Sequence, residues 1–158
     1  SAASDVYKRQ AYGIQKNLRK FGIDISLEQA ERYRVEFLKG YPKIKELQDK
    51  LLRANGIMSL GGRYWEGRAL SMTQRLNFPI QGSAAEGLKE ALALLVCNMK
   101  SSWKLVAIVH DEVVIEVVEE DVEDAKDILK FCMINGMKKI IKDIPVIVDI
   151  SINDNWCK

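Results

Sequence analysis

Two runs of β-branched and apolar residues, separated by three polar ones, constrain this chain more than any other feature. The first run is Lys104–Val109 (KLVAIV) and the second is Val113–Val118 (VVIEVV). Side chains of this type favour strands, and a short polar break between two such runs favours a β-hairpin. The sequence therefore predicts a hairpin of buried strands whose tip carries the triplet His110-Asp111-Glu112.

The triplet has two interpretations that the residues alone leave open. A polar turn between strands is most simply a solvated loop. A carboxylate held rigidly at the end of a sheet can instead bind a divalent cation, because Mg²⁺ takes oxygen ligands and is commonly held by one or two carboxylates plus substrate phosphates. Two such ions about 4 Å apart can activate a hydroxyl and stabilise the leaving group in phosphoryl transfer.

Two helices are predicted in the first third of the chain. Ser26 and Gln29 form a capping-box pattern, and apolar residues then recur at helical spacing until Gly40 and Pro42. A second amphipathic run follows and stops at Asn55-Gly56. Each helix should therefore bury one face.

A longer helix is predicted between these helices and the hairpin. Small and apolar residues recur at helical spacing from Ile80 to Met99. Gly82 and Gly87 fall inside it, where each costs about 1 kcal/mol relative to alanine, so they indicate close approach by another backbone or a ligand. Before this helix, Gly61-Gly62 indicates a small hairpin or tight loop.

After the hairpin, the chain is predicted to add a helix and a strand. Glu119–Asp121 favour a helix N-terminus, and Lys138, Lys139 and Lys142 favour its C-terminus. Pro145–Ile152 (PVIVDISI) has the composition of a last strand. The predicted fold class is α+β, with helices first and then a small antiparallel sheet backed by helices.

Length and composition narrow the class of protein. The 158 residues give room for one compact domain, and 47% hydrophobic with 29% charged residues is ordinary for a globular chain. No apolar run reaches 18 residues, and the first ten residues lack the apolar run of a signal peptide. The three cysteines have no metal-ligand spacing, which predicts reduced thiols. With His110 as the single histidine, no zinc site can be built on histidines of this chain alone.

Charge is unevenly distributed, although the net charge is only +2. Residues 1–70 hold 14 Lys/Arg against 8 Asp/Glu, and residues 71–158 hold 10 against 14. A basic half that faces a polyanion and an acidic half that holds cations would produce this asymmetry. Solvated helix faces would produce it equally well.

Several motifs, taken together, resemble those of the family A (DNA polymerase I-like) DNA polymerases. IVHDEVVIEV resembles motif C of that family, a strand–turn–strand around His-Asp-Glu, and NFPIQGSAAEGLKEAL resembles the Asn-x-Pro-x-Gln-Gly-x-Ala-Ala segment before it. Further matches, in the family's order over residues 11–157, are Tyr12-Gly13 at the end of the fingers O helix, Tyr41-Pro42, Gly62-Arg63-Tyr64 and Asn155-Trp156. The resemblance implies fingers helices followed by a palm-type sheet, as a C-terminal fragment of a larger right-hand polymerase fold.

The resemblance also implies roles for particular residues. Asp111 matches the carboxylate that coordinates the catalytic metals, and Glu112 matches its less essential acidic neighbour. His110 matches a residue placed near the primer terminus. Asn77 and Gln81 match polar residues that meet the nascent duplex. The implied catalytic residues are thus Asp111 and Glu112, with Asp111 as the metal ligand.

Physical chemistry supports some of these assignments more than others. An amide donor at Gln81 suits the duplex role, because minor-groove acceptors occupy similar places in every correct base pair. Tyr12 matches the aromatic residue of the insertion site, where a ring can stack on a base and so help to bind DNA. Two of the residues have simpler interpretations: Asn77 as a turn or cap residue, and Tyr12 as a surface aromatic.

The chain departs from the family pattern at its N-terminal end. Residues 1–10 (SAASDVYKRQ) stand where the O helix of the family carries an Arg and a Lys that hold the triphosphate, and they do not match. This predicts a non-matching N-terminal segment over 1–10, a fingers-like part over 11–70 and a palm-like part over 71–158. The thumb and the motif A aspartate, the second metal ligand, are also absent. We therefore expect little or no nucleotide incorporation by these residues alone.

The function implied is metal-dependent nucleotidyl transfer from a dNTP to a primer 3′ end. Mg²⁺ would be the cofactor, in a two-metal site completed by residues outside this chain. The partners would be primer-template DNA, dNTP and the upstream remainder of the polymerase, with no membrane, in the cytoplasm or nucleoid or in an organelle or phage. Two alternatives stay open: a non-catalytic nucleic-acid-binding remnant of the same fold, and a single-subunit RNA polymerase palm. The Gln-Gly-x-Ala-Ala segment and the His-Asp-Glu triplet favour the DNA enzyme.

Overall fold

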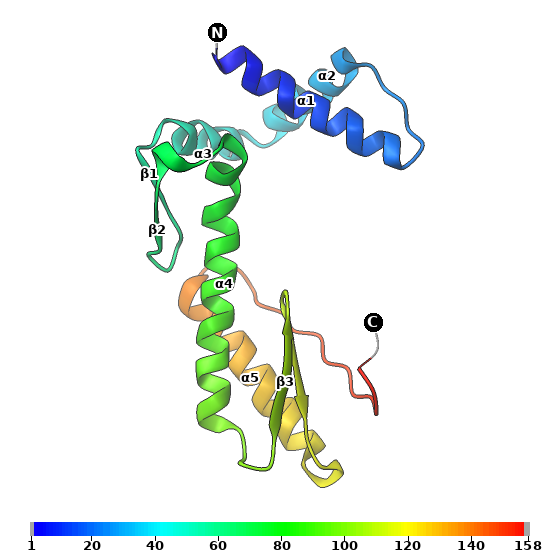
Figure 1. Ribbon diagram of the computed structural model, residues 1–158, viewed down its shortest axis with the longest axis vertical. Helices are drawn as coiled ribbons and strands as arrows, with labels where there is room; N and C mark the ends of the chain where they lie inside the picture. Colours follow the sequence, from blue (N-terminus) through cyan, green and yellow to red (C-terminus); the bar gives the residue numbers. More distant parts are fainter. Residues whose placement is uncertain (1, 157–158) are drawn as a thin grey trace. The chain divides into compact units, whose positions relative to one another are not determined.

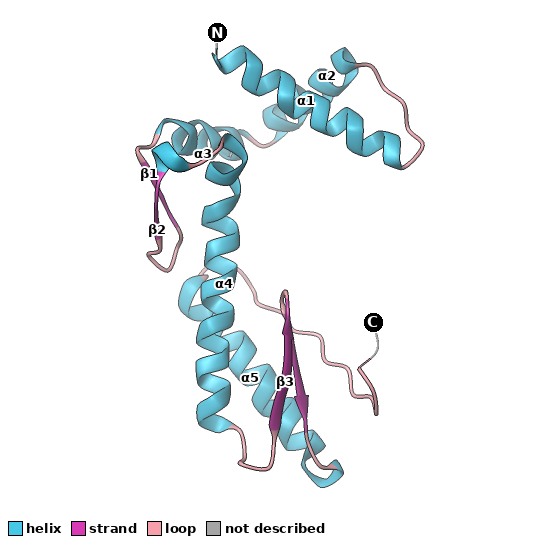
Figure 2. Ribbon diagram, viewed as in Figure 1, coloured by secondary structure: helices cyan, strands magenta, loops and turns pink. Residues whose placement is uncertain are grey.

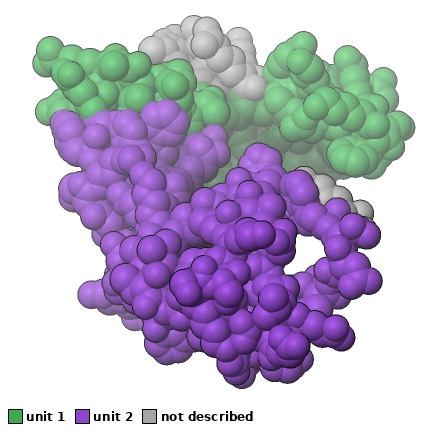
Figure 3. Space-filling view, turned by 60° about the horizontal axis from the view of Figure 1, so that its bottom comes forward, with its two compact units in different colours: residues 1–57, 66–76 green, residues 58–65, 77–158 purple. Residues whose placement is uncertain are grey.

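The structure, a computed structural model, describes residues 2–156, with side chains described from residue 10 onward. It divides into two compact units, one of residues 1–57 and 66–76 and the other of residues 58–65 and 77–158 (Figure 3). Helices predominate, and two two-stranded sheets complete the chain (Figure 2). This confirms the predicted α+β class. No helix among the described residues is both long and apolar enough to cross a lipid bilayer.

Three helices make up most of the first unit: α1 (Ala2–Lys20), α2 (Leu27–Gly40) and α3 (Pro42–Arg53) (Figure 1). The predicted capping box opens α2. Ser26 Oγ accepts a hydrogen bond from the Gln29 N–H at 3.1 Å, and Gln29 Oε1 accepts one from the Ser26 N–H at 2.8 Å. Ala11 of α1 and Ala30 of α2 are buried, since small side chains let packed helices approach closely.

The end of α3 is held by an arginine of the long helix α4 (Met72–Asn98). The Arg75 guanidinium lies within 2.7–3.3 Å of the carbonyl oxygens of Leu51, Leu52 and Ala54, and 2.6 Å from that of Gly67 in the 3₁₀ helix η1 (Gly67–Ala69). The last carbonyls of a helix lack intrahelical donors and carry partial negative charge. Arg75 therefore acts as a cap for α3 within the first unit.

Helix α4 begins at Met72 rather than at Ile80, where the sequence analysis placed its start. Ser71 and Gln74 form a second capping box that the prediction missed, with N–H to side-chain oxygen distances of 2.8 and 3.4 Å. Pro79 is tolerated inside the helix, although it removes the N–H that would bond to the Arg75 carbonyl. Asn77 consequently lies within α4, and its interpretation as a turn or cap residue is wrong.

Helix α5 (Val122–Ile140), preceded by the 3₁₀ helix η2 (Glu119–Asp121), packs against α4 through glycines (Figure 1). A Cβ on Gly136 would overlap the backbone of Ala91, and one on Gly87 would lie 2.5 Å from the sulfur of Met137. The close approach predicted at Gly87 is thereby confirmed. The nearest neighbour there is a side chain rather than a backbone or a ligand.

The sheet of the second unit is the predicted hairpin, made of β3 (Lys104–Val109) and β4 (Glu112–Glu116). Its strands are antiparallel, with an irregularity in register between Leu105 and Ala107. The expectation that both strands are buried is wrong: Val106 is 58% exposed and Ile108 47%. A sheet of only two strands leaves much of its surface uncovered.

Residues 141–156 form neither helix nor strand, so the predicted last strand over Pro145–Ile152 is wrong. A strand is stable only where its backbone groups pair along the edge of another strand. Within residues 2–156, no strand pairs with this segment. Its apolar side chains are correspondingly open to solvent, with Ile147 84% exposed.

Candidate functional site

His110 and Asp111 form the whole loop between β3 and β4, because Val109 already pairs with Glu112. The predicted three-residue tip is thus shorter, and Glu112 is the first residue of β4. His110 has a φ of 58°, in the left-handed region that few residues other than glycine adopt. Such a backbone costs on the order of 1 kcal/mol, and residues of this kind cluster at functional sites.

Asp111 and Glu112 place at this tip two carboxylates that have no protein partner among residues 10–156. Both are exposed, and within the described residues neither side chain takes part in a hydrogen bond or an ion pair. Oxygen donors of this kind fit Mg²⁺, which binds one or two carboxylates together with substrate phosphates. The part of the chain that the structure describes holds no cluster of three or more His, Cys, Asp or Glu side chains placed for a metal. The tip therefore offers two carboxylates as oxygen donors and does not by itself form a complete metal cluster.

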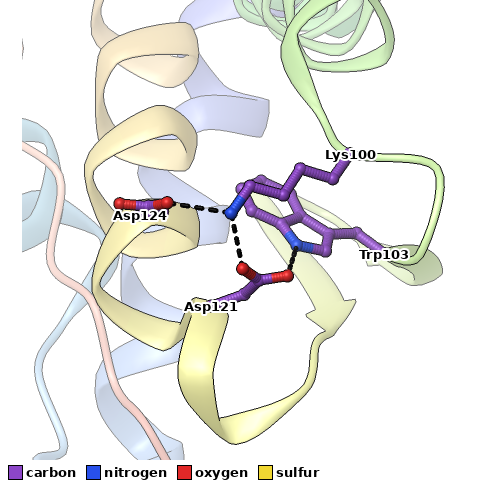
Figure 4. A network of polar contacts seen from close by, with 4 residues as sticks. All are labelled: Lys100, Trp103, Asp121 and Asp124. Atoms are coloured by element: carbon purple, nitrogen blue, oxygen red, sulfur yellow. Dashed lines mark hydrogen bonds and ion pairs between the residues drawn. The ribbon is translucent and has the colours of Figure 1, made fainter.

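A network of polar contacts fastens the base of the hairpin (Figure 4). Trp103, directly before β3, is buried and donates its Nε1–H to Asp121 Oδ2 at 2.8 Å. Lys100 Nζ donates to the other oxygen of Asp121 and, at 2.9 Å, to Asp124. The segments before β3 and after β4 are thereby joined, which holds both ends of the hairpin.

The same contacts shift the protonation of two groups. The Lys100 hydrogen bond, followed by that of the Trp103 indole, lowers the pKa of Asp121 below its ordinary value. Asp121, followed by Asp124, raises the pKa of Lys100. The ion pair is therefore fully charged at neutral pH. Of these residues only Asp121 was predicted, as part of a helix N-terminus, and the hydrogen bonds were not. The signal for them is Trp103 itself, because an indole N–H needs a partner once it is buried.

Asn77 and Gln81 lie on one exposed face of α4. They are four residues apart, which places their side chains one turn apart on the same side of the helix. Within the described residues neither side chain is hydrogen bonded. The neighbouring Ile80 is 65% exposed and Ala84 is exposed as well, so this stretch of α4 presents an open face with two amides. Such amides can donate to acceptors on a partner molecule.

Tyr12 lies in the first unit, whereas the other five site residues predicted from the sequence lie in the second. Its ring is 58% exposed. The expectation that Tyr12-Gly13 ends a helix is wrong, because α1 continues to Lys20. A glycine inside a helix costs only about 1 kcal/mol, which the helix-forming residues that follow it can offset.

The sequence model of a known protein family matches nearly the whole chain. The family is described as DNA polymerase family A, and its model matches residues 4–158. The chain belongs to DNA polymerase family A. The resemblance that the motifs carried is thereby confirmed. The division of this family A chain at residues 10 and 70 stays a prediction.

Curated relatives of this family A chain are named as DNA polymerases and are much longer than the chain. DNA polymerase I of Aquifex aeolicus (strain VF5) is 36% identical over 164 residues, a match to 97% of this chain and 28% of that protein. DNA polymerase I of Caldicellulosiruptor bescii is 29% identical, over 96% of this chain and 19% of that protein. The chain thus spans less than a third of the length of either relative.

A solved structure shares the fold. It is the POL domain of Pol1 from M. smegmatis, in complex with DNA primer-template and dNTP. The match has a TM-score of 0.67 at 22% sequence identity and covers 85% of this chain and 26% of that one. The family A chain therefore has the fold of part of a polymerase domain.

Proposed function

We propose that this chain is the C-terminal part of a template-directed DNA polymerase. In the intact enzyme a primer 3′-hydroxyl attacks the α-phosphate of a dNTP, and pyrophosphate leaves. Membership of family A supports this function, as do the names of the relatives. The observation that carries it in this chain is the pair of unshared carboxylates at the strained β3–β4 loop.

Asp111 is the proposed metal ligand, and Glu112 is its acidic neighbour in the catalytic site. Bound Mg²⁺ would supply positive charge against the triphosphate and the attacking oxygen. Asp111 lies in a loop whose ends are paired in the ladder, so its carboxylate is held on a short, rigid element. Further ligands would come from residues outside this chain, since two adjacent carboxylates are fewer than a two-metal site needs.

The DNA contacts are proposed for four residues. Gln81 and Asn77 would donate to minor-groove acceptors of the nascent duplex from the open face of α4. His110, at the hairpin tip, would lie near the primer terminus. Tyr12 would stack on a base at the insertion site. The solved structure with DNA primer-template and dNTP supports these partner kinds, and the remainder of the polymerase chain would be the further partner.

Two further consequences belong to this proposal. The 158 residues alone should incorporate little or no nucleotide, because the remaining metal ligands and the cations that hold the triphosphate lie elsewhere. The enzyme would act where DNA is copied, in the cytoplasm or nucleoid. The competing function is DNA binding without turnover, which the lack of a complete metal cluster among the described residues would also fit.

Primer extension by the intact polymerase tests the proposal. We expect extension from dNTPs that requires Mg²⁺, stops with EDTA and falls by at least about 10²-fold in Asp111→Asn. Glu120→Gln is the matched control, because Glu120 is an exposed acidic residue after β4 and away from the tip. Binding of primer-template without extension under any of these conditions would favour the non-catalytic function instead.

A further inference from the structure

The loop between β1 (Gly56–Met58) and β2 (Tyr64–Glu66) has a defined internal geometry. The Ser59 N–H donates to the Arg63 carbonyl at 2.9 Å, and the Gly62 N–H donates to the Ser59 carbonyl at 3.2 Å. Gly62 has a φ of +96°, which a side chain would disfavour. The Arg63 N–H in turn donates to Ser59 Oγ at 2.9 Å. Ser59 therefore organises the loop from within.

Two polar side chains of α4 fasten this loop from outside. The carboxylate of Glu86 uses both oxygens, accepting from Ser59 Oγ at 2.9 Å and from the Gly61 N–H at 3.1 Å. Ser83 Oγ accepts from the Leu60 N–H at 2.9 Å. Ser59 and Ser83 are each only 4% exposed, so the hydrogen bonds that these two serines make are shielded from water, whereas the Gly61–Glu86 bond is exposed. Shielded bonds of this kind are costly to break, because the groups left behind have no solvent to pair with.

An aromatic contact completes the attachment. A Cβ on Gly82 would overlap the ring of Trp65, so only glycine admits the indole at this point of α4. The Trp65 ring also lies 5.3 Å from that of Phe78. The close approach predicted at Gly82 is therefore made by Trp65, beside Ser83 and directly after Gln81.

The part of α4 that receives the loop is intrinsically weak as a helix. Pro79 leaves the Arg75 carbonyl without its helical donor, and Gly82 is a poor helix former. Asn77 and Gln81 lie in this same stretch. The loop and Trp65 together cover one face of it, at Phe78, Gly82, Ser83 and Glu86, while the amides occupy an exposed face.

We propose that Ser83 and Glu86 are positioning residues for Gln81. By fastening the Ser59–Arg63 loop to α4, they stiffen a weak stretch of helix and hold the Gln81 amide at a fixed height and direction. Neither side chain touches DNA in this role. The inference rests on the proposed function, in which Gln81 checks base-pair geometry, and it adds the residues that make such a check possible.

The test compares extension from matched and mismatched primer termini by the intact polymerase. Glu86→Gln keeps the size of the side chain but leaves only one oxygen that can accept. The Ser59 hydroxyl and the Gly61 N–H, which each donate to one carboxylate oxygen of Glu86, can then no longer both be satisfied in the same way. Ser83→Ala removes the acceptor for the Leu60 N–H and also the hydroxyl that donates to the Pro79 carbonyl within α4. We expect each variant to lose discrimination against mismatches by roughly three- to tenfold, with a smaller change in extension from matched termini. Glu90→Gln, one turn further along α4, alters a surface ion pair with Lys139 and should leave the ratio unchanged.

A double variant separates positioning from general loss of stability. If Glu86 acts through Gln81, then Glu86→Gln adds little to the loss already caused by Gln81→Ala. Additive losses in the double variant would overturn the inference. Wild-type discrimination in both Glu86→Gln and Ser83→Ala would overturn it as well, if Gln81→Ala loses discrimination. Should Glu86→Gln fold poorly, Ser83→Ala alone decides. Failure of the proposed function is distinct, because it would show as wild-type extension by the Asp111→Asn variant, or as primer-template binding without extension by the unmodified polymerase.

Discussion

The Trp103 indole N–H donates a 2.8 Å hydrogen bond to Asp121, which joins the residue before β3 to the segment after β4. This bond holds the two strands together at the base of the hairpin, while the loop at its other end carries His110 and Asp111. Because the acceptor is a carboxylate, the bond is charge-assisted and stronger than one between neutral groups.

Replacing Trp103 by phenylalanine should destabilise the chain. Trp103→Phe keeps an aromatic ring in a buried site but removes the N–H donor, and a hydrogen bond to a charged group contributes about 1.5–3 kcal/mol. Urea unfolding followed by far-ultraviolet circular dichroism measures the loss. Trp156→Phe, at an exposed position, is the control and should change the free energy of unfolding by less than about 0.5 kcal/mol. Equal stability of the two variants would contradict the role given to this bond.

The stability of the folded chain should depend on pH through the ionisation of Asp121. Its pKa is lowered in the folded chain, so the ionised form contributes stability above the unfolded value of 3.8, and this contribution is lost as the pH falls through the lower, folded pKa. Lys100, whose pKa is raised, stays charged throughout this range.

The measurement is the difference in Tm between wild type and Asp121→Asn, taken from pH 7 downward. The difference should be constant to about pH 5 and should shrink below 3.8. A difference that does not change down to the acid limit of folding would show that the charge of Asp121 contributes nothing.

Gly136→Ala should destabilise the α4–α5 packing, because the added methyl would overlap the backbone of Ala91, which cannot shift as cheaply as the end of a flexible side chain. Overpacking of this kind costs about 1–3 kcal/mol, partly offset by the better helix propensity of alanine. Gly13→Ala in α1 is the matched control, since a Cβ there meets nothing within 4 Å. We expect Gly13→Ala to leave stability unchanged or raise it by up to about 1 kcal/mol, and the opposite order would refute the packing account.

The two described cysteines should differ in reactivity. Cys97 is exposed on α4, whereas Cys132 is buried in α5 and desolvation raises its pKa. The thiolate is the reactive form, so native chain treated with iodoacetamide at pH 8 should be alkylated at Cys97 much faster than at Cys132. Peptide mapping by mass spectrometry gives the two rates. Similar rates in the native state would mean that α5 does not stay packed.

Local patterns predicted those elements whose signals lie within a few residues. The Ser26–Gln29 capping box and the β3–β4 hairpin depend on neighbours in sequence, and both are confirmed. The start of α4 was misplaced because the apolar spacing used for the prediction begins only at Ile80, whereas the helix opens at the Ser71–Gln74 box, ahead of Pro79. A capping box is a positive signal, and one proline in a helix does not cancel it.

Features that depend on the rest of the fold were not predictable in this way. Residues 145–152 have the composition of a strand, but composition does not supply an edge to pair with. The Trp103–Asp121 bond joins residues 18 apart, and the Glu86–Ser59 bond joins residues 27 apart, so neither follows from local spacing. The site residues themselves came from motifs, and their proposed contacts with DNA and metal stay predictions.

Single-turnover incorporation by the intact polymerase tests the central claim, that Asp111 is a metal ligand for nucleotidyl transfer. With primer-template and dNTP saturating, we predict that Asp111→Asn slows the chemical step by at least about 10²-fold while the Kd for primer-template changes by less than about threefold, because the carboxylate acts on the metal and not on the duplex. Glu120→Gln should match wild type in both quantities. Incorporation by Asp111→Asn at the wild-type rate would contradict the claim.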